Sequence, residues 1–439
     1  MSLLPPVRIG LLGLGTVGGG TLAVLRRNAT LIAARAGRRI EVVCASARDL
    51  GRARALDLTG IELHADPRAV VDDPRIDILV ELIGGIEPAR ELVLRALANG
   101  KHVVTANKAL IALHGNEIFE AARSRGLMVA FEAAVAGGIP VIKVMREALA
   151  GNDIQWLAGI INGTCNFILS AMCDAGREFD EVLAEAQRLG YAEADPSFDV
   201  DGIDAAHKLT ILASLAFGIP LQFERVFVEG IRNISAEDVT YAERLGYRIK
   251  HLGIARQQAQ GIELRVHPAL VPTRAPLANV NGVMNAVMVS GDAAGPVVLF
   301  GAGAGALPTA SSVVADLVDV TRLLTTDSEN RVPHLAFQPD TMENLQTLDI
   351  CDIETAYYLR LMAADEPGVL ADVTRILADL GISIEAIMQL DRAPGSAEVP
   401  VVILTQRVRE AAMNQAIASL ESLPTIRAPL NRIRVETLT

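Results

Sequence analysis

The densest group of chemically useful side chains lies in AQRLGYAEADPSFDVDGIDAAHK, residues 186–208. Asp204 and Lys208 are four residues apart, so a helix would place them on one face. Glu193 and Asp199 precede that helix in an acid-rich loop. A lysine ammonium oriented by carboxylates can protonate a carbonyl oxygen, as carbonyl reduction requires. The same spacing also fits a capped helix with a solvated ion pair, and spacing alone does not choose between the two.

A glycine-rich turn near the amino end offers a phosphate cradle. The segment Gly13-Leu14-Gly15-Thr16-Val17-Gly18 fits GxGxxG, directly after an apolar strand and directly before a helical pattern. There the first glycine permits the tight turn, the second lets the backbone approach a pyrophosphate, and the third lets the helix pack on the strand. We predict a dinucleotide site formed by Gly13, Gly15, Thr16, Val17 and Gly18; the alternative is a structural turn.

Two further basic residues follow predicted strands. An NAD site usually places Asp or Glu after the second strand, whereas this chain reads Ala45-Ser46-Ala47-Arg48. Serine and arginine suit a 2′-phosphate, so we predict NADP rather than NAD, with Arg48 as a ligand; the alternative is a solvated surface charge. Lys108 follows the strand-like HVVTA at the carboxyl edge, where α/β sheets bind ligands, and is either functional or a surface lysine.

The remaining reactive residues carry weaker signals. Cys165, in NGTCN, is either a nucleophile at a strand-to-helix turn or, more often for cysteine, a small buried hydrophobe. The four cysteines form no CxxC, so we expect reduced thiols and a cytoplasmic protein. His207 points about 100° away from Lys208 around a helix and is assigned to packing. The histidines form no HExxH motif, and we expect no transition-metal site.

Composition limits the classes of partner. A chain of 439 residues favours about three domains. The net charge of −12 argues against broad binding to nucleic acid or anionic membranes, since both require an excess of Lys and Arg. The N-terminal apolar run is too short to span a bilayer, and we expect no targeting or membrane segment.

The elements that must position these residues form three predicted domains. Residues 1–140 alternate doubly apolar strands with helices, including one helix over 16–36, which predicts a doubly wound parallel sheet of the Rossmann type. Residues 141–325 mix helical runs, 236–256 among them, with strand-like pieces, and predict an α+β substrate and dimerisation domain. A polar linker spans 326–353. The order βαββαβ follows over 354–439, with a last strand near 433–438.

Taken together, these motifs resemble those of the homoserine dehydrogenases. Residues 186–208 fit the family signature at eleven fixed places, which are Ala186, Gly190, Tyr191, Ala192, Asp195, Pro196, Asp199, Val200, Gly202, Asp204 and Lys208. Further matches are GLGTVG, TANKAL, EAAVAGGIP, INGTCNFIL and GAGAGALPTASSVVAD. The tail, with DEPGVL at 365–370, resembles an ACT domain, a small amino-acid-sensing module.

The resemblance implies a fold, an activity and a set of roles. The reaction would be the NAD(P)-dependent interconversion of L-homoserine and L-aspartate 4-semialdehyde, in threonine, methionine and isoleucine biosynthesis. A helix near 309–323 would return to the Rossmann sheet, and the chain would form a homodimer or homotetramer. Lys208 would be the general acid, and Lys108 would link cofactor and substrate. The other implied substrate ligands are Glu193, Asp199, Asp204 and Thr164.

Two sites are implied by resemblance alone. A sodium-like cation would be held by the backbone oxygens of Glu132, Val135, Gly137 and Ile139. Threonine would inhibit by binding where ACT domains pair, near Asp365, Pro367, Gly368, Val369 and Leu370; the alternative is a domain kept only for oligomerisation. Two competing functions remain at this point: a phosphorylating aldehyde dehydrogenase with Cys165 as nucleophile, and a non-catalytic amino-acid sensor.

Overall fold

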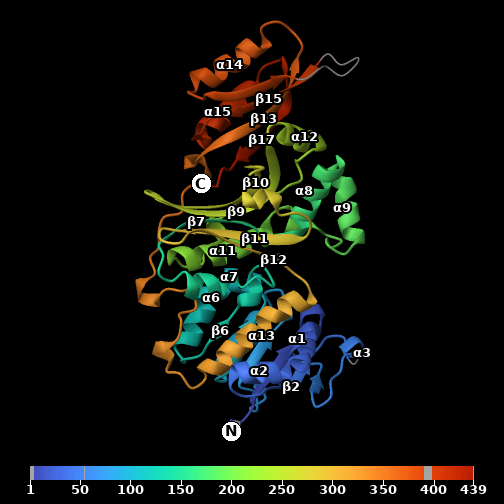
Figure 1. Cartoon of the computed structure of the whole chain (residues 1–439), viewed down its shortest axis with the longest axis vertical. Coiled ribbons are helices and arrows are strands. Elements are labelled where there is room, and N and C mark those ends of the chain that lie inside the picture. The colour runs from blue at the N-terminus through green and yellow to red at the C-terminus, as the bar shows by residue number, and fades with distance from the viewer. Residues whose placement is uncertain (1–3, 54, 390–397, 439) are drawn as a thin grey trace.

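The computed structural model describes residues 4–53, 55–389 and 398–438. Three units follow one another along its long axis: a unit at the N-terminal end that carries the predicted dinucleotide-binding turn and is named the nucleotide-binding unit below, a central unit, and a C-terminal unit (Figure 1). Two sheets organise them, one of six strands and one of eleven.

The first sheet is parallel, in the order β3-β2-β1-β4-β5-β6. Its strands are β1 (Val7–Leu12), β2 (Ile40–Ser46), β3 (Glu62–His64), β4 (Ile78–Glu81), β5 (His102–Thr105) and β6 (Val129–Ala130), with helices α1 (Thr16–Arg27), α2 (Ala29–Ala36), α3 (Leu50–Ala53), α4 (Pro67–Asp72), α5 (Ala89–Ala98) and α6 (Lys108–Arg123). The central strands carry buried apolar side chains on both faces, as in other covered parallel sheets. The strand order reverses at β1 and β4, where open α/β sheets bind ligands.

Two features of the helices beside this sheet can be compared with the sequence predictions: the helix predicted over 16–36 and the helix expected near 309–323. The predicted helix over 16–36 is two helices, because α1 ends at Asn28 and α2 starts again after it. Helix α13 (Ala306–Leu323) comes back from the central unit to lie beside α1 (Figure 1). A Cβ on Gly20 would stand 2.4 Å from the carbonyl oxygen of Ala306, so glycine permits this close packing.

The central unit packs its helices on an antiparallel sheet. It contains β7 (Ile154–Ile160), β8 (Phe227–Val228), β9 (Tyr247–Gln258), β10 (Gly261–Pro272), β11 (Met284–Gly291) and β12 (Gly295–Ala302), with α7 (Val141–Lys143), the π-helical turn η2 (Val144–Ala148), α8 (Gly163–Ala175), α9 (Phe179–Arg188), α10 (Ser197–Val200), α11 (Ile203–Phe217) and α12 (Ala236–Arg244). Short 3-10 turns occur at η1 (Glu132–Ala134), η3 (Phe223–Arg225) and η4 (Pro276–Asn279).

The predicted helix over 236–256 is wrong in its second half. Helix α12 stops at Arg244, and the residues from Tyr247 onward form β9, which pairs with β10 along its whole length. This strand is buried on both faces, so its apolar residues do not alternate and also match a helical period.

The C-terminal unit follows the order βαββαβ. Its elements are β13 (Glu354–Ala364), α14 (Val369–Asp379), β14 (Ile384–Gln389), β15 (Glu398–Thr405), the short β16 (Val408–Arg409), α15 (Glu410–Glu421) and β17 (Ile426–Val435), preceded by turns η5 (Ser328–Asn330), η6 (Pro339–Thr341) and η7 (Ile350–Asp352). The last strand begins seven residues earlier than predicted, because a shift in its register with β13 accommodates Pro429.

The second sheet runs without a break from the central to the C-terminal unit. Strand β17 pairs in parallel with β10 at Ala269 and Leu270, and with β13 on its other side. Two ion pairs join the units at this junction: Arg265 of β10 contacts Glu436, and Arg434 of β17 contacts Glu229. Within the C-terminal unit, Arg434 also pairs with the buried Glu410. The C-terminal unit is therefore attached rigidly rather than through a free linker.

Candidate active site

Two lysines meet on one buried carboxylate. Asp204 Oδ2 lies 2.6 Å from Lys208 Nζ, and Asp204 Oδ1 lies 2.8 Å from Lys108 Nζ. Lys208 also donates to the carbonyl oxygen of Ile161 at 2.7 Å. The side chains of Asp204 and Lys208 are 3% and 10% exposed. The i, i+4 pair seen in the sequence is therefore buried at a junction of domains, not a solvated surface pair.

The local fold explains this meeting. Helix α11 starts after Gly202, whose φ of +90° turns the chain sharply, and carries Asp204 and Lys208 inward. Helix α6 starts at Lys108 after its N-cap Asn107, whose side chain accepts from the amide of Leu110. Because α6 and α11 pack together, the lysine of the nucleotide-binding unit reaches the carboxylate of the central unit.

Asn162 is a residue of this cluster that the sequence reasoning missed. Its Nδ2 donates to Asp199 Oδ1 at 2.7 Å and to Asp204 Oδ2 at 2.8 Å, so one amide holds both carboxylates. Its Oδ1 accepts from the amide of Cys165 and caps α8. The sequence shows that Asn162 follows an apolar strand and can cap the next helix. It does not show the hydrogen bonds to Asp199 and Asp204, which lie 37 and 42 positions further along the chain.

The charges of the cluster shift its pKa values in opposite directions. Burial lowers the pKa of Lys208, although Asp204 opposes this and Lys108 adds to it. Burial acts the same way on Lys108, but there the charge and hydrogen bond of Asp204, with the charges of Asp199 and Glu193, together outweigh it, and the pKa is raised. Burial would raise the pKa of Asp204, yet the two lysines hold it well below its usual range. Burial and the charge of Asp204 raise the pKa of Asp199. Lys208 is thus a stronger acid than a free lysine.

The other predicted substrate ligands surround this cluster. Thr164 Oγ1 donates to the carbonyl oxygen of Tyr191 at 2.6 Å and lies 3.2 Å from Asp199 Oδ2. Glu193 is exposed, and its charge favours the protonated form of Lys108 and so raises the pKa of that lysine. The ring centroid of Phe198 lies 5.7 Å from Lys108 Nζ. On its solvent side, the cluster therefore has acidic residues, Glu193 and Asp199, near the buried Lys208.

The glycine-rich turn has the geometry of a phosphate cradle. Gly13 has φ +96°, and a Cβ on Gly18 would stand 2.1 Å from the carbonyl oxygen of Gly13. A Cβ on Gly15, the N-cap of α1, would meet nothing within 4 Å. The turn therefore leaves open space in front of the α1 N-terminus, which suits an anionic phosphate. Thr16 and Val17 belong to the first turn of that helix. Arg48 is exposed and lies two residues after the end of β2, the neighbour of β1 in the sheet.

Cys165 and His207 lie near the cluster without belonging to its reactive part. Cys165 is fully buried, donates to the carbonyl oxygen of Asp199, and has a pKa raised well above its usual value by burial. A thiol held in that state is a poor nucleophile, which disfavours the aldehyde dehydrogenase alternative. His207 packs between the rings of Phe198 and Phe223, and burial lowers its pKa to about 4.

The segment of the expected cation site forms a tight turn after β6. Ala136 and Gly137 both have positive φ, and a Cβ on Gly137 would stand 2.4 Å from the carbonyl oxygen of Gly303. The carbonyl oxygens of Glu132, Gly137 and Ile139 each accept one hydrogen bond, from Val135, Ser312 and Val141. The described residues contain no group of three or more His, Cys, Asp or Glu side chains that could hold a metal ion.

Of the expected effector residues, Asp365, Pro367 and Gly368 precede α14, and Val369 and Leu370 are its first two residues. Figure 1 shows α14 at one end of the molecule, well away from α6 and α11. Asp365, Pro367 and Gly368 are exposed, Val369 is buried, and Leu370 is half-buried. Within the part of the chain that the structure describes, no helix is long and apolar enough to cross a membrane.

Three family models match the chain, and their order follows the units. Residues 13–132 match "Homoserine dehydrogenase, NAD binding domain", residues 140–318 match "Homoserine dehydrogenase", and residues 357–422 match "ACT domain". The chain is 62% identical to a homoserine dehydrogenase of Pseudomonas aeruginosa over 433 residues, and 52% identical to one of Neisseria gonorrhoeae over 439 residues. Each match covers 99% of both chains.

Solved structures agree with these matches. The crystal structure of a homoserine dehydrogenase from Thiobacillus denitrificans superposes with a TM-score of 0.95 at 62% identity, covering 99% of each chain. A hyperthermophilic archaeal homoserine dehydrogenase in complex with NADPH covers 74% of this chain and 99% of its own length, with a TM-score of 0.63 at 29% identity. The two lysines on one buried carboxylate, the phosphate cradle and the shared sequence lead to one conclusion: this chain belongs to the homoserine dehydrogenases, which are NAD(P)-dependent oxidoreductases, and carries an ACT domain.

Proposed function

We propose that Lys208 is the proton donor when this enzyme reduces L-aspartate 4-semialdehyde to L-homoserine. The observation that carries this is the buried Nζ of Lys208, held by Asp204 and the carbonyl oxygen of Ile161 and acidified by burial. The reduced nicotinamide, when bound, supplies the hydride. As the C–H bond forms, the carbonyl π electrons move to oxygen, and the Lys208 ammonium transfers a proton there. In the reverse direction neutral Lys208 takes the hydroxyl proton.

The carboxylates around Lys208 have two roles in this proposal. Glu193, Asp199 and Asp204 create a negative potential that attracts the substrate ammonium. Both oxygens of Asp204 contact lysines, so it acts on the substrate hydroxyl region mainly through Lys208. Lys108 lies on the nucleotide-binding side of the same carboxylate and links cofactor to substrate, and Thr164 completes the substrate site by orienting Asp199.

The test of these roles is a comparison of two lysine variants. Lys208→Ala should lose turnover in both directions while retaining its affinity for NADPH, because no cofactor contact is assigned to Lys208. Lys108→Ala should lose affinity for both substrate and cofactor, because it stands between them. Equal turnover of the Lys208→Ala protein and the wild type would contradict the proposal, and absence of any NADPH oxidation by the wild type would favour the sensor alternative.

We further propose that NADP is the preferred cofactor. The residues fit the group: Gly13, Gly15 and Gly18 leave room for a pyrophosphate at the start of α1, with Thr16 and Val17 beside it. No acidic residue stands directly after β2, where the exposed Arg48 can pair with a 2′-phosphate. The NADPH-bound archaeal relative is consistent with this preference. Comparing kcat/KM for NADPH and NADH tests it directly.

A sodium-like cation at residues 132–139 is also part of the proposal. Carbonyl oxygens have two lone pairs, so those of Glu132, Gly137 and Ile139 keep one after their single hydrogen bonds, and Val135 offers a fourth oxygen. Bound there, the ion would stabilise the turn that joins the two units. Melting temperature measured in sodium against choline chloride at equal ionic strength should rise with sodium; equal values would contradict the site.

Regulation and assembly complete the proposal. Threonine binding at residues 365–370 should inhibit turnover saturably, and Asp365→Asn should weaken inhibition without changing uninhibited turnover; no inhibition would leave the ACT domain a purely structural role.

The exposed apolar Val298 and Phe300 on β12 favour a homodimer or homotetramer through this strand. Phe300→Asp should reduce the molar mass in light scattering. The four unpaired thiols favour a cytoplasmic setting.

A further inference from the structure

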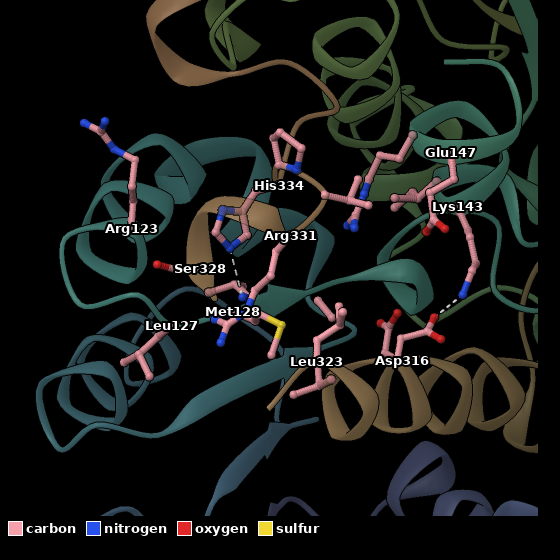
Figure 2. Close-up of a pocket in the computed structure, with 18 of the residues that line it drawn as sticks. Arg123, Leu127, Met128, Lys143, Glu147, Asp316, Leu323, Ser328, Arg331 and His334 are labelled. Carbon is pink, nitrogen blue, oxygen red and sulfur yellow. Dashed lines mark hydrogen bonds and ion pairs between the residues drawn. The ribbon is translucent and has the colours of Figure 1, made fainter. Parts of the chain in front are cut away.

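A cavity of about 550 Å³ lies beside β6, the edge strand of the first sheet (Figure 2). Its wall comes from the end of α6, from β6, from the second half of α13, from α7 with η2, and from the connector over 328–340. Lys108, Asp204 and Lys208 do not line it. The volume is within the range of small-molecule sites, about 300–1,000 Å³.

The connector closes this cavity through defined contacts. Arg331 donates to the carbonyl oxygen of Gly126 at 2.6 Å, and the amide of Val129 on the edge strand donates to His334 Nε2 at 3.1 Å. His334 also stacks on Phe119 at 5.0 Å between ring centroids. Figure 2 places Arg331, His334 and Met128 on one side, with Asp316 and Leu323 of α13 below and Lys143 with Glu147 opposite. The walls are therefore fixed before any ligand arrives.

Two charged side chains in this wall lack full partners, although one is buried and the other half-buried. Arg146 Nε is buried without a hydrogen-bond partner among the described residues, and its guanidinium forms no ion pair with them. Asp316 accepts from the amide of Glu132 through Oδ2 at 2.9 Å, while its Oδ1 accepts no hydrogen bond from any described residue. Among the other charges of this wall, Lys143 pairs with Asp319, whereas Glu147 and Glu329 form no ion pair with any described residue but are exposed to solvent. An unpaired cation thus faces the same cavity as a carboxyl group with one unused oxygen. Burial and the charge of Glu132, which also lines the cavity, raise the pKa of Asp316 well above its usual value, and an ammonium partner would stabilise its ionised form.

We propose that this cavity binds a small zwitterion, an α-amino acid with an unbranched aliphatic side chain. Its carboxylate would pair with Arg146, its ammonium would pair with Asp316 Oδ1, and its side chain would lie on Met128 and Leu323. A zwitterion satisfies both groups at once, whereas a simple anion or a simple amine satisfies one and leaves the other without a partner. The site is separate from the ACT-domain turn at 365–370.

A ligand bound in the cavity would contact three parts of the molecule. The ligand would touch the nucleotide-binding unit through α13 and β6, the central unit through η2, and the connector that leads to the ACT domain. Binding should therefore change KM for NADPH or substrate, although the test below needs no turnover.

The experiment measures binding to the full-length chain by titration calorimetry. The probes are L-norvaline, pentanoate, which lacks the amine, and butylamine, which lacks the carboxylate. The variants are Arg146→Gln and Asp316→Asn, with Arg123→Gln as a matched control. Arg123 is a rim arginine that already pairs with Glu120. Circular dichroism and melting temperature establish that each variant is folded.

We expect saturable norvaline binding at millimolar concentration, at least about tenfold tighter than either half-probe. Each of Arg146→Gln and Asp316→Asn should weaken it at least about tenfold, and Arg123→Gln should leave it unchanged. Absence of saturable binding would overturn the proposal. Binding that survives both substitutions would place the amino acid elsewhere, and pentanoate binding as tightly as norvaline would make the site a carboxylate site; either result also overturns it. Loss of turnover alone bears on Lys208 and not on this cavity.

Discussion

Replacing Asn162 by aspartate should damage the reaction and lower the stability of the protein, while preserving the cap of α8. The amide of Asn162 donates to Asp199 at 2.7 Å and to Asp204 at 2.8 Å. A hydrogen bond to a charged group contributes about 1.5–3 kcal/mol, so losing both removes about 3–6 kcal/mol from the cluster, less where the two are coupled. The new carboxylate would also repel the carboxylates of Asp199 and Asp204, which lose their hydrogen-bond donor. The cap of α8 survives, because a carboxylate oxygen still accepts from the amide of Cys165.

The fall in kcat/KM depends on how much of the lost hydrogen-bond energy stabilises the transition state. If about 2–4 kcal/mol of the lost positioning acts on Lys208 through Asp204, kcat/KM falls about 30- to 1,000-fold. The assay is NADPH oxidation with L-aspartate 4-semialdehyde, with kcat and KM resolved, next to urea unfolding and NADPH binding. The negative charge gained should also favour protonated Lys208, and so move the pH dependence of homoserine oxidation to higher pH.

Two further variants separate positioning from stability. Asn162→Ala loses the cap as well, at a cost of about 1 kcal/mol, but adds no carboxylate that repels Asp199 and Asp204, so it tests the two hydrogen bonds without the added charge. Asp66→Ala removes the cap of α4, where Asp66 accepts from the amide of Arg68 at an exposed site, and should lower stability by a similar amount of about 1 kcal/mol with unchanged kcat. A kcat/KM for Asn162→Asp within about threefold of the wild type would refute the reasoning.

Three other predictions follow from the same structure. Arg48→Ala should raise KM for NADPH by about tenfold or more and leave KM for NADH unchanged, because only NADPH carries the 2′-phosphate; equal changes with both cofactors would exclude that contact. Cys165→Ala should keep its turnover and need no phosphate, because the thiol is buried and protonated; loss of turnover in a folded protein would revive the nucleophile. Burial lowers the pKa of His102, His207 and His251 to about 4, below the value of 6.5 in the unfolded chain. The unfolded state therefore binds more protons between pH 6.5 and pH 4, and urea unfolding should show stability falling across that window by about 1.4 kcal/mol per pH unit for each histidine; a flat profile would contradict their burial.

The parallel sheet and the phosphate cradle could be predicted from local sequence. Doubly apolar strands alternating with helices leave few topologies, and the glycine spacing depends on residues within one turn. The element boundaries were harder. The chain over 247–258 became a strand because β10 pairs with it, a long-range contact that overrode its apparent helical period.

The candidate site was predictable in its lysine and carboxylates but not in its arrangement. Asp204 and Lys208 lie on one helix, so their proximity was readable from spacing. The contact of Lys108 with the same carboxylate depends on packing between helices about one hundred residues apart. Asn162 carried only the signal of an N-cap, and the cavity around Arg146 carried none, because its walls come from four separate stretches of chain.

The most direct test of the central claim is single-turnover reduction of L-aspartate 4-semialdehyde by the NADPH-loaded Lys208→Ala enzyme, with Lys143→Ala as a control lysine variant. Lys143 is paired with Asp319 away from the cluster. The account predicts an unchanged Kd for NADPH and a rate lower by about 10²–10⁴-fold in Lys208→Ala alone, the usual contribution of a general acid. A Lys208→Ala rate equal to that of the control, at equal NADPH occupancy, would contradict it.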